Sequence, residues 1–220
     1  MHQWVKYYII AKNQWLVLQA NMNTEAHRYF IVNKPYNMVS QFVSSHAVTL
    51  LRDLDFEFPP GTHAIGRLDN HSEGLLLLTT NKKITRLLFQ GKTRHKRKYL
   101  VQVNNTVTED KIRQLQSGVQ IPVANNRPYI TIPCEAEIIS EPGQVSRHQY
   151  PFIVYPPYTW LQLTLREGKF HQVRKMMLAI QHRCKRLIRI SIEDICLDDL
   201  PTGCVKEISE HEFFTKLKLE

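Results

Sequence analysis

The stretch HAIGRLDNHSEGLLLLTT, residues 63–80, decides the fold expected of this chain. Residues 62–69 have the composition of a strand and residues 70–74 that of a turn, and the four consecutive leucines that follow predict a strand buried on both faces. Asp69 stands where the first strand meets the turn, so its carboxylate is expected beside the core, where it needs a positive partner. Arg67 shares a strand face with Asp69, a position from which the two side chains do not meet squarely.

Three roles remain open for Asp69 on the residues alone. An ionised, shielded carboxylate can act as a nucleophile or a base. An aspartate before a turn can instead bond to its own backbone as a turn cap, and this structural role is at least as common. A third role pairs Asp69 with Glu73 as the two carboxylates of a glycosidase, although the turn between them leaves their separation undetermined.

The composition is that of a soluble globular protein, with 43% hydrophobic and 22% charged residues in a chain of 220. No apolar stretch approaches the roughly 20 residues that cross a bilayer, so we expect no membrane partner. The four cysteines form no C-x-x-C pair, and the histidines are scattered. We therefore expect no metal, no disulfide and no cofactor, and a cytoplasmic chain with reduced thiols. Nothing in the sequence demands more than a monomer.

Positive charge is concentrated in two segments. Residues 82–98 hold eight Lys or Arg and no acid, and residues 166–189 hold eight more with one acid, Glu167. The net charge of the chain is +9, so these segments account for all of its positive excess. Solvated helix faces explain scattered charge but not this near-absence of acids, and the segments therefore predict a nucleic acid partner.

The expected fold class is α+β, with a largely antiparallel mixed sheet shared by two lobes and flanked by helices and loops. Strands are predicted at 29–32, 62–69, 75–80, 97–104, 118–123, 129–140, 159–168, 186–197 and 204–209. Helices are predicted at 47–56, 82–90, 109–117 and 169–180. Residues 1–27 are expected to be a flexible N-terminal extension, and residues 28–220 to be the folded domain, divided near 91–98. Residues 141–158 are expected to form a long loop.

Five ordered blocks resemble the RNA pseudouridine synthases of the RsuA branch. The most specific is AIGRLDNHSEGLLLLTTN, which is similar to the catalytic motif G-R-L-D-x-x-S-E-G-L-L-L-L-T-N. The others are YFIVNKPYNMVSQF, RKYLVQV, LREGKFHQVRKMMLAI and RLIRISIEDICLDDLPTG, so that the resemblance covers residues 28–208. The lack of an N-terminal S4-type RNA-binding module and the long segment before residue 159 resemble the members that act on the large ribosomal subunit.

The resemblance implies a role for each matching residue. Asp69 matches the catalytic aspartate, Tyr99 the tyrosine that stacks on the target base, and Arg174 the basic residue that ion-pairs with the aspartate. Arg67 matches an arginine that handles the extruded nucleotide, and Leu187 an apolar residue of the pocket. Further RNA contacts are expected from the two basic segments, at Arg94, Lys96, Arg97, Lys98, Lys169, His171 and Lys175.

The chain departs from the family pattern where E-G-R-N-R-Q reads EGKFHQ, which indicates altered RNA contacts rather than lost activity. The expected function is therefore the isomerisation of one uridine in ribosomal RNA, within the large-subunit 23S RNA. Two alternatives remain: a non-catalytic RNA-binding or ribosome-assembly protein, and an N-glycoside hydrolase that uses Asp69 with Glu73.

Overall fold

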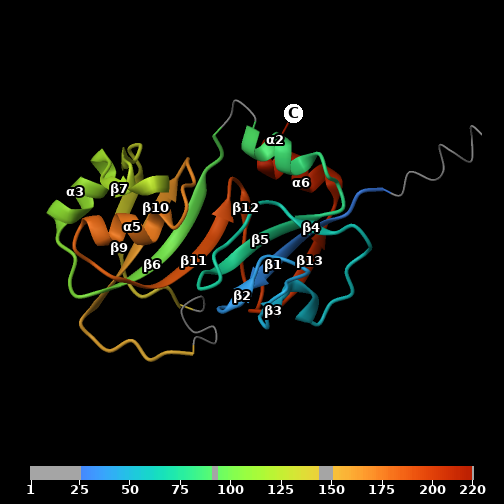
Figure 1. Cartoon of the computed structure of the whole chain (residues 1–220), viewed down its shortest axis with the longest axis horizontal. Helices are drawn as coiled ribbons and strands as arrows, with labels where there is room; N and C mark the ends of the chain where they lie inside the picture. Colours follow the sequence, from blue (N-terminus) through green and yellow to red (C-terminus); the bar gives the residue numbers. More distant parts are fainter. Residues whose placement is uncertain (1–25, 91–93, 144–150, 220) are drawn as a thin grey trace, which may run out of the picture.

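The computed structural model describes residues 26–90, 94–143 and 151–219. A mixed sheet runs across the molecule (Figure 1), and among the described residues its strands follow the order β13-β1-β5-β11-β6-β10-β9, with β4 beside β5 and β12 beside β11. The strands of this sheet are β1 Tyr29–Lys34, β4 His63–Ala64, β5 Glu73–Thr79, β6 Arg97–Asn104, β9 Glu135–Ile139, β10 Tyr158–Leu165, β11 Cys184–Ile192, β12 Ile195–Cys196 and β13 Val205–Ile208.

Helices and two small strand pairs complete the fold. Helices α2 and α6 lie together over one end of the sheet, and α3 and α5 lie at the other end (Figure 1). The helices are α2 Ile84–Gln90, α3 Glu109–Ser117, α5 Gln172–Ala179 and α6 Glu210–Leu217, with short 3-10 turns η1 Leu51–Asp53 and η2 Ala124–Asn126. The small pairs join β2 Met38–Val39 to β3 Thr49–Leu50, and β7 Gln120–Pro122 to β8 Pro128–Ile130.

The large sheet has one parallel pairing among its described strands, that of β5 with β11. This confirms the expected α+β class with a largely antiparallel mixed sheet. The parallel contact is short, with Glu73 opposite Ile188 and Gly74 opposite Arg189. Gly74 has φ +94°, and a Cβ atom there would lie 2.3 Å from the carbonyl oxygen of Arg189. Only glycine therefore allows the two strands to approach this closely.

The four leucines of β5 pack into two different hydrophobic clusters, one on each face of the sheet. Leu75 and Leu77 belong to the cluster that contains Phe213 of α6, while Leu76 and Leu78 belong to the cluster on the opposite face. All four are fully buried, because alternate side chains of a strand point to opposite faces and both faces are covered here. The predicted buried strand is confirmed.

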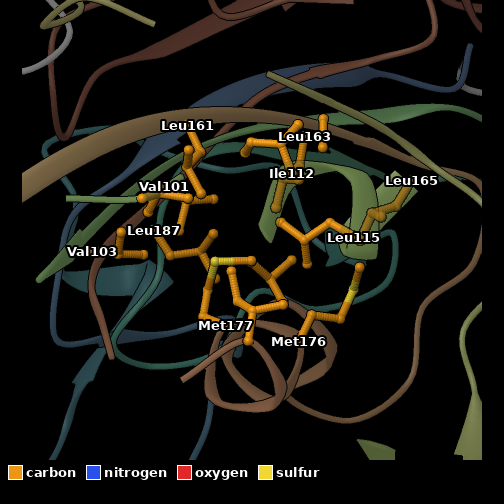
Figure 2. Packing of buried hydrophobic residues seen from close by; sticks show 14 of the residues in the cluster. Val101, Val103, Ile112, Leu115, Leu161, Leu163, Leu165, Met176, Met177 and Leu187 are labelled. Atoms are coloured by element: carbon orange, nitrogen blue, oxygen red, sulfur yellow. The ribbon is translucent and has the colours of Figure 1, made fainter. Parts of the chain in front are cut away.

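A third core lies between the sheet and α5. Met176 and Met177 of α5 face Val101 of β6 and Leu187 of β11, and Ile112 of α3 closes the same cluster (Figure 2). The cluster also contains Val173 of α5 and Ile180 at its end, so the buried apolar residues of this segment lie on one face of the helix. The position of α5 over β6 and β11 is thus fixed by buried apolar side chains.

Several elements differ from the expectation. The strand predicted at 129–140 divides into β8 and β9, which belong to different sheets, and the strand predicted at 186–197 divides into β11 and β12. The helix predicted at 47–56 is wrong: the chain forms only β3 and η1 there, because the carboxylate of Asp53 accepts the backbone N–H of Leu50 at 2.7 Å. The strand predicted at 62–69 shrinks to β4, since Gly66 takes φ +73° and bends the chain out of the sheet. Helix α6 has no counterpart in the predictions, although Ser209 accepts the N–H of Glu212 as its N-cap.

Parts of the expected domain organisation lie outside the described residues. The extension predicted at 1–27 falls there except for residues 26 and 27. The division near 91–98 falls there in part, and the described sheet continues without a break from β5 through β11 to β6. Before β10 begins, the described residues of 141–158 form no strand and no complete turn of α-helix.

Candidate active site

Asp69 lies in a bend between β4 and β5 that is held on both sides. The N–H of Ser72 donates to the carbonyl of Asp69 at 3.0 Å, so backbone atoms close the turn and the carboxylate is left for other contacts. The hydroxyl of Ser40 donates to the carbonyl of Leu68 at 2.8 Å and accepts its N–H at 3.0 Å. Leu68, the residue before Asp69, is therefore fixed by the residue that follows β2.

Lys34 holds the other side of the same bend. Its ammonium group is buried and donates to the carbonyls of Pro35 and Met38 at 2.8 Å and to that of Asn70 at 3.3 Å. Burial lowers the pKa of Lys34 to about 7, although the carboxylates of Glu73 and Asp69 oppose this effect. The amino-terminal strand thus supports the loop that presents Asp69.

The Asp69 side chain faces a cavity of about 930 Å³. Its wall brings together Asp69, Tyr99 from β6, and Leu187 and Arg189 from β11. The carboxylate is 33% exposed, so it is shielded by the cavity and not sealed in the core. A carboxylate, an aromatic ring and an apolar side chain within one concave wall are suited to a small planar ring with polar edges.

A histidine and an arginine lie near Asp69 in the cavity wall. Oδ1 of Asp69 lies 3.7 Å from Nε2 of His171, at the start of α5. Arg189 is buried in the cavity wall, and its Nε donates to the carbonyl of Leu75 at 2.8 Å. Burial lowers the pKa of the Arg189 guanidinium, while the hydroxyl of Tyr99 and the carboxylate of Asp69 act in the opposite direction. Its Nη2 has no hydrogen-bond partner among the described residues.

The expected ion pair between Asp69 and Arg174 is not formed. Nη2 of Arg174 donates to the carbonyl of His71 at 2.5 Å, and Nη1 lies 3.8 Å from Sγ of Cys184. The left-handed backbone of His171, with φ +54°, delays the start of α5 to Gln172 and turns residue 171 towards Asp69. Arg174 therefore supports the Asp69 turn through the backbone of His71.

Sequence reasoning missed Arg189, although a signal was present. Leu187 was predicted to line the pocket, and on a strand the residue two positions later points to the same face. The two side chains do share the cavity wall. The periodicity of β11 therefore places an arginine beside the predicted pocket.

Glu73 takes no part in the cavity. Its carboxylate accepts two hydrogen bonds from Arg186, at 2.8 Å from Nε and 2.8 Å from Nη2. The side chains are only 4% and 3% exposed, so both charges are satisfied within the core. A carboxylate in this arrangement is not available as the second acid of a glycosidase.

The turn before α5 is tied by hydrogen bonds. The carboxylate of Glu167 accepts the hydroxyl of Tyr129 at 2.6 Å and the side-chain amide of Gln172 at 2.8 Å. The same Gln172 accepts the N–H of Lys169 at 2.8 Å. The Glu and Gln of the EGKFHQ segment therefore hold the loop, and the three residues between Gly168 and Gln172 are displayed along the cavity.

The remaining predicted RNA contacts divide into two groups. Four of them line the cavity, namely Arg67, Arg94, Arg97 and Lys169, as does His171. Three do not line it, namely Lys96, Lys98 and Lys175. Lys96 lies 3.8 Å from Glu135, and Lys175 donates to the carbonyl of Pro122 at 2.8 Å.

Neither a metal site nor a membrane span appears among the described residues. No group of three or more His, Cys, Asp or Glu side chains is arranged to hold a metal ion in the described ranges. No helix there is long and apolar enough to cross a bilayer.

Comparisons with known proteins identify the family of this chain. The family described as RNA pseudouridylate synthase matches residues 28–179. Ribosomal large subunit pseudouridine synthase E of Vibrio vulnificus is 35% identical over 190 residues, which cover 86% of this chain and 78% of that one. Ribosomal small subunit pseudouridine synthase A of Escherichia coli is 31% identical over 186 residues, covering 84% and 72%.

The fold has a solved counterpart. A crystal structure of a pseudouridylate synthase superposes with a TM-score of 0.70 at 26% identity, covering 89% of this chain and 75% of that one. Human RNA Pseudouridylate Synthase Domain Containing 1, at 15% identity and a TM-score of 0.54, shares the fold. The family match, the sequence relatives and the solved structure agree, and the chain belongs to the RNA pseudouridylate synthase family.

Proposed function

We propose that this RNA pseudouridine synthase isomerises one uridine of large-subunit (23S) ribosomal RNA and that Asp69 is its catalytic residue. The observation that carries the proposal is the cavity in which Asp69, Tyr99, Leu187 and Arg189 meet. The names of the relatives support a ribosomal RNA substrate. The identity of 35% to a large-subunit enzyme, against 31% to a small-subunit enzyme, supports the large subunit.

The reaction rearranges the bonds of one nucleotide. The N1–C1′ bond breaks, the uracil ring turns, and C5 bonds to C1′, while C5 loses a proton and N1 gains one. The change is redox-neutral and needs no electron acceptor. An ionised Asp69 can attack C1′, add to C6, or remove a proton from the sugar.

The cavity supplies the other requirements of the reaction. Tyr99 offers a ring on which an extruded base can stack, an interaction worth about 1–3 kcal/mol. Leu187 adds an apolar surface to the wall. Arg67, Arg94 and Lys169 add positive charge that can hold phosphates around the extruded nucleotide.

The two alternatives have less support. The N-glycoside hydrolase needs a second carboxylate, and Glu73 is occupied by Arg186 in the core. A non-catalytic RNA-binding protein would not need a shielded aspartate facing a buried arginine.

The test is the release of tritium from RNA transcripts labelled at C5 of uridine. We expect release from 23S RNA with the wild type and none with Asp69→Asn, which keeps the shape of the side chain but removes its charge. Thermal unfolding of the two proteins should coincide, which shows that the variant is folded. Equal release by both would refute the role of Asp69, and release from 16S RNA alone would refute the large-subunit target.

Product analysis separates the isomerase from the hydrolase. The isomerase leaves the mass of the RNA unchanged, whereas a hydrolase gives free uracil and an abasic site.

We further propose that the enzyme works as a monomer and that it works in the cytoplasm. The second proposal is supported by the four cysteines, which are all free thiols. Sedimentation of the purified protein tests the monomer.

A further inference from the structure

Phe170 stands at the mouth of the cavity with most of its ring in solvent. The side chain lines the cavity, and the residue is 75% exposed. An isolated apolar residue on a surface needs no explanation by itself. Phe170 differs because its neighbours fix its place relative to Asp69.

The ring of Phe170 is the outer layer of a stack. Its centroid lies 3.9 Å from that of His171, and the two planes differ by 18°. The inner ring, His171, places Nε2 3.7 Å from Oδ1 of Asp69. Phe170 therefore stacks on the imidazole ring whose Nε2 lies beside the Asp69 carboxylate, which places it next to the proposed catalytic residue.

The turn beneath Phe170 is built to stay in place. The N–H of Gln172 donates to the carbonyl of Lys169 at 3.0 Å, and its side chain is anchored by Glu167. Nζ of Lys175 lies 5.5 Å from the Phe170 ring centre, and Lys169 also lines the cavity. A rigid aromatic ring beside ammonium groups matches a base and its phosphates.

We propose that Phe170 stacks on the base of a nucleotide next to the extruded uridine, so that it holds the flanking RNA strand at the cavity mouth. This inference rests on the proposed function, because it places the target uridine in the cavity below. Extrusion of a base leaves its neighbours unstacked, and a fixed ring at the mouth restores one stacking contact. Stacking is insensitive to base identity, so Phe170 contributes to affinity and position and leaves sequence choice to other contacts.

The test is fluorescence of a single-stranded nine-nucleotide RNA of uridines with 2-aminopurine at its centre. Stacking on an aromatic ring quenches 2-aminopurine. We expect quenching when the wild type binds, its loss with Phe170→Ala, and its recovery with Phe170→Tyr. The dissociation constant should rise about 5- to 160-fold in Phe170→Ala, which corresponds to the stacking range of about 1–3 kcal/mol.

Two exposed residues provide matched controls. Tyr155 is an exposed aromatic residue and Leu178 an exposed apolar residue of α5, and neither lines the cavity. Tyr155→Ala and Leu178→Ala should bind and quench as the wild type does. Unchanged quenching and affinity in Phe170→Ala would overturn the proposal, as would bound RNA that is not quenched by the wild type.

A second comparison separates this proposal from the proposed function. Asp69→Asn should quench as the wild type does while releasing no tritium. If Asp69→Asn released tritium normally and Phe170→Ala still lost quenching, the role of Asp69 would fail and the stacking role would stand.

Discussion

Two acidic residues of one segment, four positions apart, meet two arginines of one strand in opposite ways. Glu73 is paired with Arg186 through two hydrogen bonds of 2.8 Å, and both side chains are buried. Asp69 instead faces a cavity, with Arg189 in the wall and His171 at 3.7 Å. Each carboxylate lies near an arginine, but only Glu73 and Arg186 are joined by hydrogen bonds. We call Glu73 with Arg186 the closed pair and Asp69 with Arg189 the open pair.

The difference separates structure from chemistry. Nε and Nη2 of Arg186 both donate to the Glu73 carboxylate, so this pair holds β5 against β11. These groups are therefore not available to bind a substrate. Arg189 has an Nη2 with no partner among the described residues, and the Asp69 carboxylate is one-third exposed. Unsatisfied groups of this kind cost stability and are retained at sites that use them.

The largest effect is expected when the closed pair is broken. Arg186→Leu leaves Glu73 buried without a partner, and we expect the free energy of unfolding to fall by about 3–5 kcal/mol. Denaturant unfolding measures this loss. A decrease below about 1 kcal/mol would show that the pair is not a structural tie. The double variant Arg186→Leu with Glu73→Leu should recover stability, since it leaves no buried charge.

Breaking the open pair should reduce activity more than it reduces stability. We expect Arg189→Leu to reduce kcat/KM for tritium release by about 100- to 1,000-fold, the range for one preorganised electrostatic group. Its unfolding free energy should fall less than that of Arg186→Leu, because no buried carboxylate is bonded to it. A variant that is fully active but unfolds easily would exchange the roles assigned to the two arginines.

The two arginines also show what the sequence could and could not predict. The motif around Asp69 implies a catalytic role by resemblance, which stays a prediction, and the period of β11 was sufficient to place Arg189 beside Leu187. Arg174 was expected to be the partner of Asp69 because it matches the basic residue of the family motif. A matched motif gives no information on where the helix that carries it begins. The start of α5 depends on the positive φ of His171, which follows from tertiary contacts and not from local propensity.

A smaller effect is expected at Arg174. Since it reaches only the backbone carbonyl of His71, we expect Arg174→Ala to lower kcat/KM by no more than about tenfold. A direct ion pair with Asp69 would have led to a much larger loss. Steady-state tritium release decides between these values, and a loss that matches Arg189→Leu would restore Arg174 as the partner of the aspartate.

The smallest effect concerns the basic residues. Arg94 lines the cavity and Lys96 does not, although the two are separated by one residue. Arg94→Ala should weaken RNA binding and reduce the slope of log affinity against log salt by roughly 0.7–0.9, the value for one phosphate contact. Lys96→Ala is the matched control and should leave the slope unchanged. Equal slopes for both variants would show that the cavity wall does not define the RNA path.

Prediction of the fold was accurate where packing and local pattern agree. The strand at 97–104 and the helix at 109–117 have the predicted bounds, and the helix ends at Gly118, which takes φ +96°. Prediction failed at 47–56, where an amphipathic pattern is overridden by the hydrogen bond from Leu50 to Asp53. It also failed at 62–69, where Gly66 replaces a strand with the bend that carries Asp69.

The short parallel contact between β5 and β11 at Gly74 determines when the active site can form during synthesis of the chain. Glu73 and Arg186 are separated by 113 positions in the chain, so this contact forms only when both distant segments have been synthesised and have met. Until then the nascent chain carries the first basic segment, and so an attraction for RNA, without an assembled carboxylate–arginine site. Catalytic competence is thereby coupled to completion of the fold.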